Sequence, residues 1–117
     1  MNQLTKERAR ELLQNASQRF IVVYGDVMLD EFVWGDVTRI SPEGPVPVVD
    51  VRRESVHLGG AANVLANLVS LGTRASVVGI VGNDQAGERL RAELKDAGAS
   101  TDTLVVDGSR PTTIPAA

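Results

Sequence analysis

Two carboxylates follow an apolar run in the stretch "GDVMLD", from Gly25 to Asp30. An ionised Asp side chain only accepts hydrogen bonds, so Asp26 and Asp30 are suited to hydroxyl groups such as those of a sugar. Ligands of open α/β sheets bind outside the carboxyl ends of the strands, which is where this stretch is expected. Its position therefore indicates a ligand site. The alternative is that both Asp residues only cap a turn.

A second stretch, "HLGGAAN", places Gly59 and Gly60 at the start of an apolar helix pattern, with Asn63 in its first turn. Glycine lets a ligand or another segment approach the backbone, and a helix N-terminus offers unpaired N–H groups. These three residues are candidates for a polar ligand, and the Asn63 amide suits a pair of hydroxyls. The alternative is tight strand–helix packing, with Asn63 bonded to nearby backbone. The stretch matches neither the P-loop nor the G-x-G-x-x-G pattern.

A third stretch, "GNDQAG" from Gly82 to Gly87, follows a strand pattern and opens a helix pattern. An N-cap role for Asp84 explains it completely, so the structural interpretation is preferred. His57 is the one histidine and could act in acid/base chemistry, but no obvious carboxylate orients it. We expect a structural or surface role for it. One histidine and scattered carboxylates do not make a transition-metal site.

The composition is that of a soluble globular domain. The 117 residues are 43% apolar and 23% charged, with a net charge of −3, and suit one domain with a modest core. The chain lacks the basic footprint of nucleic-acid binders, and its aromatic content is only 3%. It has no cysteine, which excludes a disulfide scaffold and thiolate chemistry. No apolar run suits a membrane span or a signal peptide, so we expect a cytoplasmic protein without a membrane partner.

Helix and strand patterns alternate along the chain and must position these residues. This alternation predicts a layered α/β fold with a mostly parallel sheet. The expected elements are a helix from Thr5 to about Asn15, a strand from Phe20 to Tyr24 buried on both faces, an excursion of short extended pieces and turns at 31–56, a helix from Gly60 to Leu71, a strand from Arg74 to Gly82, a helix from Asp84 to Ala97 and a strand from Ser100 to Gly108.

Taken together, the motifs resemble the N-terminal portion of ribokinase-like (PfkB-type) carbohydrate kinases. The resemblance runs through "GDVMLDEFVWGDVTRISPEGPVPVVDV", "LGGAANVLANLVSLG" and "VGIVGNDQAGERL" and covers about residues 10–114. The segment "TRISPEGPVPV" is most similar to the heptose-7-phosphate kinase domain of bifunctional heptose kinase/ADP-heptose synthases. The resemblance implies an α/β domain with a small β-strand lid at about 31–56, through which two subunits pair as a homodimer.

The resemblance also implies a site. Asp30, Gly59, Gly60 and Asn63 match the substrate-binding residues of the family, and the substrate is a sugar phosphate. The family member would transfer a phosphoryl group from ATP, with Mg²⁺, to the anomeric hydroxyl of D-glycero-β-D-manno-heptose 7-phosphate. That reaction belongs to the synthesis of lipopolysaccharide core precursors. "RPTT", which contains Arg110 and Thr112, matches a stretch leading toward the active site, without an assigned role.

The family's catalytic Asp lies in a Gly-Ala-Gly-Asp type motif far downstream, next to the nucleotide site, and this sequence contains no such motif. We therefore assign no catalytic, ATP-binding or metal-binding residue, and we expect the chain to be inactive by itself. One alternative is a non-catalytic sugar-binding or dimerising α/β module. A small nucleotide-binding domain is disfavoured, because the Walker and dinucleotide fingerprints are absent.

Overall fold

A computed structural model describes residues 3–40 and 47–115, with side chains described for 3–32 and 55–115. The order of helices and strands is the one the sequence pattern predicts. In chain order the elements are α1 (Lys6–Ser17), β1 (Phe20–Tyr24), β2 (Val27–Ile40), β3 (Pro47–Gly60), α2 (Ala61–Ser70), β4 (Arg74–Val81), α3 (Gln85–Asp96) and β5 (Leu104–Val106). The predicted turn within "ISPEGPVPV" involves residues 41–46, which lie outside the described residues.

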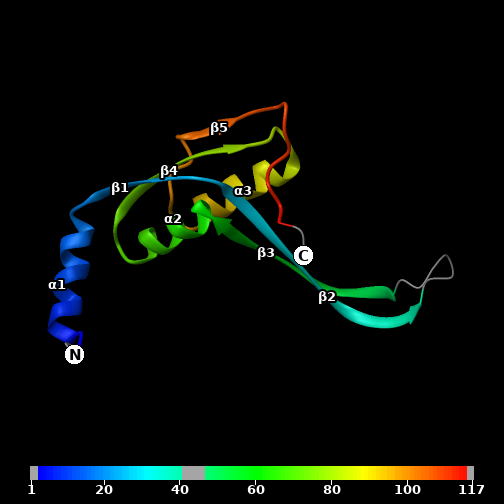
Figure 1. Ribbon diagram of the computed structural model, residues 1–117, viewed down its shortest axis with the longest axis horizontal. Coiled ribbons are helices and arrows are strands. Elements are labelled where there is room, and N and C mark those ends of the chain that lie inside the picture. Colours follow the sequence, from blue (N-terminus) through cyan, green and yellow to red (C-terminus); the bar gives the residue numbers. More distant parts are fainter. Residues whose placement is uncertain (1–2, 41–46, 116–117) are drawn as a thin grey trace.

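A parallel sheet with strand order β1-β4-β5 confirms the predicted fold class. The connection from β1 to β4 includes α2, and the connection from β4 to β5 includes α3. Both crossovers move in the same direction along the sheet, so right-handed connections place α2 and α3 on the same face (Figure 1). The core lies between these helices and the sheet. Its buried apolar residues are Val27, Leu29, Ala61, Ala62, Leu65, Val77, Val81, Leu90, Leu94, Ala99 and Leu104.

The prediction that the first strand is buried on both faces is wrong. Phe20 is 62% exposed and Tyr24 is 85% exposed, and only Val23 of β1 packs partly against the core. β1 is an edge strand of the described sheet, and α2 and α3 cover one face only. Its apolar run is typical of a parallel strand covered on both faces, but the described helices cover only one of them.

The excursion is a long antiparallel ribbon rather than a set of short pieces. β2 and β3 each span 14 residues and pair from Val27↔Gly60 to Ile40↔Pro47, with register shifts at Trp34/Gly35 and Val37/Arg39. Pro47 is the first residue of its strand, where a missing N–H is tolerated, so it does not interrupt the ladder. Figure 1 shows the ribbon projecting away from the sheet and helices.

The final strand is shorter than predicted. β5 spans only Leu104–Val106, whereas the sequence suggested a strand over 100–108. Local bonds hold the preceding residues in a turn, since the Ser100 hydroxyl accepts from the Asp102 N–H and Leu104 N–H donates to the Thr101 carbonyl. Ser and Asp side chains offer the backbone this alternative to a strand ladder.

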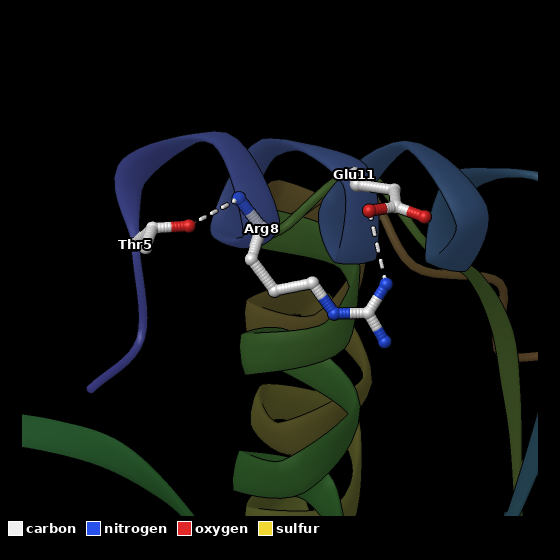
Figure 2. A network of polar contacts seen from close by, with 3 residues as sticks. All are labelled: Thr5, Arg8 and Glu11. Atoms are coloured by element: carbon white, nitrogen blue, oxygen red, sulfur yellow. Dashed lines mark hydrogen bonds and ion pairs between the residues drawn. The ribbon is translucent and has the colours of Figure 1, made fainter. Parts of the chain in front are cut away.

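The helix α1 begins where the sequence predicts. The Thr5 hydroxyl accepts a hydrogen bond from the Arg8 N–H at 3.1 Å, and Arg8 pairs with Glu11 at 3.0 Å (Figure 2). Both charged side chains are more than half exposed, so this ion pair contributes little to stability. No residue of α1 is buried. Within the described residues, no helix is long and apolar enough to cross a membrane.

Candidate functional site

The connection between β1 and β2 is tied to two other elements. Gly25 N–H donates to the Val78 carbonyl of β4 at 3.2 Å, and the Asp26 carbonyl accepts from Ala61 N–H, the first residue of α2, at 2.8 Å. The first and second candidate stretches therefore meet at the carboxyl end of β1. This is the edge of a parallel sheet at which α/β proteins bind ligands.

The two glycines lie where the ribbon returns to the sheet. Residues Met28 and Gly59 are register partners, and Asp30 pairs with His57. A Cβ atom on Gly59 would lie 2.8 Å from Asp30 Oδ2, so the Asp30 carboxylate lies directly against this backbone. Gly60 has φ +57°, and a Cβ there would overlap the Asp26 carbonyl oxygen. Close approach by the chain's own groups thus explains the need for glycine at both positions.

The site formed by Asp30, Gly59, Gly60 and Asn63 is open to solvent, and so to a ligand. Gly59 is buried, Asp30 is half-buried, and Gly60 and Asn63 are exposed. The helix α2 has Gly60 as its N-cap, without a side-chain capping bond, so its first turn presents backbone N–H groups near Asn63. The structure brings Asp30, Gly59 and Gly60 together and places Asn63 on the helix that begins immediately after them.

A cavity of about 290 Å³ is lined in part by the connection between β1 and β2. Its lining includes Asp26, Tyr24, Ile80, Arg110 and Thr113, and none of the four predicted sugar-binding residues. Tyr24 and Ile80 are among the apolar side chains left exposed on the uncovered face of the sheet. Of the two Asp residues in the first stretch, Asp26 lines this cavity, and the Asp30 carboxylate lies against Gly59.

The third stretch does more than cap a helix. The Asp84 carboxylate accepts from Gly87 N–H at 2.8 Å, which is the predicted cap of α3. It also accepts from the Thr112 hydroxyl at 2.6 Å and from the Thr112 N–H at 2.9 Å. The hydrogen bonds from Thr112, with that from Gly87, lower the pKa of Asp84 below its ordinary value. The interpretation that an N-cap explains this stretch completely is therefore wrong.

Thr112 is the residue that the sequence analysis named without a role. It is 4% exposed, and its hydroxyl also accepts from Gly82 N–H at 2.9 Å. The next residue, Thr113, forms a parallel bridge with Met28, and its carbonyl accepts from Leu29 N–H at 3.1 Å. No local sequence signal could reveal the contact between Asp84 and Thr112, because these residues are 28 positions apart.

His57 occupies a surface position. It is exposed on β3, and its ring meets that of Phe32 edge-on, with centroids 5.3 Å apart and an interplanar angle of 74°. This agrees with the structural or surface role expected from the sequence. Within the part of the chain that the structure describes, no group of three or more His, Asp or Glu residues could hold a metal ion.

Comparison with known families assigns this fold to a class of protein. The family model of the pfkB family carbohydrate kinases matches residues 18–117. The chain therefore belongs to the pfkB family of carbohydrate kinases.

Particular relatives refine this assignment. The chain is 54% identical over 102 residues to the bifunctional protein HldE of Bradyrhizobium diazoefficiens, covering 87% of this chain and 21% of that protein. It is 55% identical over 84 residues to the bifunctional protein HldE of Magnetococcus marinus, covering 72% of this chain and 17% of that protein. The chain thus spans about a fifth of the length of the curated relatives it matches.

Solved sugar kinases share the fold. An uncharacterised sugar kinase from Pyrococcus horikoshii is 32% identical with a TM-score of 0.59, the match covering 80% of this chain and 30% of that one. The fructokinase of Halothermothrix orenii is 29% identical with a TM-score of 0.60, covering 82% and 32% of the two chains. These similarities confirm the ribokinase-like fold that the sequence motifs suggested.

Proposed function

We propose that this chain forms the sugar-binding wall and lid of a heptose-7-phosphate kinase. The complete enzyme would transfer the γ-phosphoryl group of ATP to the anomeric hydroxyl of D-glycero-β-D-manno-heptose 7-phosphate. The observation that carries this proposal is the Asp30 carboxylate held against Gly59 at the open start of α2. The similarity to HldE proteins directs the choice of heptose among the sugars.

Each proposed site residue has a distinct chemical task. The Asp30 carboxylate would accept hydrogen bonds from sugar hydroxyls. The exposed backbone of Gly60 would let the sugar ring lie close to the chain, and the first turn of α2 would offer N–H donors. The Asn63 amide, which both donates and accepts, would bind a hydroxyl pair. These residues bind and orient a sugar, and none of them is proposed to move a proton.

Phosphoryl transfer needs more than this site supplies. Catalysis in such enzymes rests on positioning and on stabilising the charge of the transferred group, with ATP and Mg²⁺. We assign neither the catalytic Asp nor the ATP and Mg²⁺ sites to this chain, because it has no Gly-Ala-Gly-Asp type motif. We therefore propose that these 117 residues bind sugar but do not transfer phosphate when they are alone.

The remaining proposals follow from family membership. The ribbon of β2 and β3 would act as the lid, over about residues 31–56, and would pair with its copy in a homodimer. Its two long strands leave two edges on which another strand could add. The reaction would supply lipopolysaccharide core precursors in the cytoplasm.

Isothermal titration of the purified chain tests the sugar site. We expect heptose 7-phosphate to bind and Mg-ATP not to bind. Asn63→Ala should weaken sugar affinity by about tenfold, since a lost hydrogen bond in a site costs roughly 1–1.5 kcal/mol. Asn67→Ala is the matched control, because Asn67 is an exposed residue of the same type one turn further along α2. Equal affinity of all three proteins would contradict the assigned site.

A non-catalytic module remains the second candidate. The observation in its favour is the long projecting ribbon of β2 and β3, which offers strand edges for pairing with a second copy and has no part in phosphoryl transfer. Titration of the same protein with a set of sugars and sugar phosphates distinguishes the two candidates. Equal binding of many sugars would favour the module, whereas selective binding of the heptose phosphate would favour the kinase portion.

A further inference from the structure

We propose that Asp84 and Thr112 form a clasp that positions Asp30 for its ligand. The clasp comprises the Asp84 carboxylate, the Thr112 N–H and hydroxyl, and Gly82 N–H. This inference rests on the proposed sugar-binding role of Asp30. Neither clasp residue is proposed to touch the sugar, so both are positioning residues.

The clasp is closely packed. Thr112 is 4% exposed, and its hydroxyl donates to Asp84 Oδ1 at 2.6 Å while accepting from Gly82 N–H at 2.9 Å. A Cβ atom on Gly82 would lie 2.5 Å from the Arg110 carbonyl oxygen, and one on Gly87 would lie 2.9 Å from the Thr112 hydroxyl. Gly82 therefore leaves room for the 110–112 backbone, and Gly87 leaves room for the Gly82 carbonyl oxygen and the Thr112 side chain. This explains the two glycines of "GNDQAG", which a helix cap alone does not require.

The clasp is linked to the strand that carries Asp30 through one backbone hydrogen bond. With Thr112 fixed, the following Thr113 carbonyl accepts from Leu29 N–H at 3.1 Å, next to the Met28–Thr113 bridge. Leu29 is fully buried, and the next residue of the strand, Asp30, faces the opposite side. Its carboxylate then lies against Gly59. Asp84, the N-cap of α3, is thus connected to Asp30 by two contacts, Asp84–Thr112 and Thr113–Leu29, and by the peptide bonds that join Thr112 to Thr113 and Leu29 to Asp30.

A comparison within the chain separates this clasp from an ordinary turn. Asp107 also accepts hydrogen bonds from a backbone N–H and a hydroxyl, but both belong to Ser109, two residues away. That arrangement closes a local turn and links no distant segments. Asp84 holds a residue 28 positions away, so its bonds can determine where the 110–114 segment lies against β2.

Hydrogen exchange measured by NMR on the 117-residue chain tests the connection. Thr112→Val keeps the side-chain shape and removes the hydroxyl, and Thr112→Ser restores it. We expect the Leu29 amide to exchange roughly tenfold faster in Thr112→Val than in wild type, as for the loss of a buried hydrogen bond. Thr112→Ser should retain wild-type exchange. The Ala99 amide, bonded to the Leu94 carbonyl in the core, should be unchanged in both variants.

Two exchange results would overturn the proposal. Unchanged protection of Leu29 in Thr112→Val would show that the clasp does not hold β2. Equal acceleration at Leu29 and Ala99 would show that Thr112 only adds to overall stability.

Titration with heptose 7-phosphate supplies the functional test. Affinity should fall by roughly fivefold or more in Thr112→Val, because a misplaced carboxylate loses its bonds to the ligand. It should recover in Thr112→Ser and stay at the wild-type value in Asp107→Asn. Wild-type affinity in Thr112→Val would overturn the positioning role. If the wild-type chain bound no sugar, the proposed function would fail, and the exchange comparison would still decide whether the clasp holds β2.

Discussion

At the scale of single residues, the candidate site depends on a close contact between a carboxylate and a glycine. The Asp30 carboxylate occupies the space where any other residue at position 59 would place its side chain. This contact holds Asp30 beside the start of α2, where its free lone pairs can accept further hydrogen bonds. The glycine is therefore needed for the placement of the carboxylate.

Gly59→Ala should weaken binding of heptose 7-phosphate by roughly tenfold, because the new Cβ atom would displace a carboxylate that makes charge-assisted hydrogen bonds. Titration calorimetry measures this effect. Gly108→Ala is the matched control, since a Cβ there would lie 3.8 Å from the nearest atom, Asn83 Cβ. Unchanged affinity in Gly59→Ala would show that Asp30 does not bind the sugar in this position.

At the scale of secondary structure elements, the junction between β3 and α2 determines the geometry of the site. The strand ends at Gly60 and the helix begins at Ala61, with no loop between them. This abrupt change requires φ +57° at Gly60, a conformation that other residues rarely adopt. The Asp26 carbonyl then caps the helix by accepting from Ala61 N–H. The glycine is thus what joins the ribbon to the helix.

Gly60→Ala should lower the free energy of unfolding by roughly 3 kcal/mol or more, from backbone strain together with overlap with Asp26. Gly72→Ala is the comparison variant. Gly72 has φ +89° at the end of α2, and a Cβ atom added there would have no atom of a non-adjacent residue within 4 Å. Gly72→Ala should therefore lower the free energy of unfolding by only about 1–2 kcal/mol. Urea denaturation of both variants measures the difference. Equal losses would mean that the contact with Asp26 is unimportant.

The connection between α3 and the 110–114 segment should depend on pH. The hydrogen bonds from Thr112 and Gly87 lower the pKa of Asp84 below its ordinary value of 3.8. A carboxyl group with a lowered pKa in the folded state contributes stability above its unfolded pKa, and this is lost as the pH falls through the folded pKa. The difference in unfolding free energy between wild type and Asp84→Asn should therefore be constant near neutral pH and should shrink below about pH 4. A difference independent of pH would argue against the ionised clasp.

At the scale of the whole molecule, the described chain is extended, and one face of its parallel sheet is not covered by helices. Its Cα radius of gyration is 18.8 Å, against about 13 Å for a compact domain of this length. The ribbon and α1 project from the sheet (Figure 1). One sheet face carries exposed apolar side chains. These exposed side chains are Phe20, Val22, Tyr24, Ile80 and Val105.

Such a face should promote association of the isolated chain, because parallel sheets are normally covered on both sides. Sedimentation velocity should therefore show species larger than a dimer that grow with concentration. Val22→Lys and Val105→Lys, each at a position 55% exposed, should reduce these species. Leu71→Lys, at a position 57% exposed outside the sheet, should leave them unchanged. If all three variants reduced these species equally, the added charge would act by raising the solubility of the chain, and association through this sheet face would be contradicted.

The amino-acid sequence by itself determined the order of the elements, the capping residues Thr5 and Asp84, and the fold class. These features depend on interactions within a few residues, such as apolar periodicity and side-chain bonds to the nearest N–H groups. The motifs around Gly59 and Asn63 likewise identified the family, because they are contiguous in the chain. The assignment of individual sugar-binding residues stays a prediction.

Only the tertiary structure decided which distant segments meet. It showed that Asp84 holds Thr112, that the Asp30 carboxylate lies against Gly59, and that β1 leaves most of its apolar side chains exposed. A sequence pattern reports the preference of a residue for burial or for a hydrogen bond, but not the partner that satisfies it. That partner depends on how strands and helices pack across tens of residues, where a local pattern carries no information.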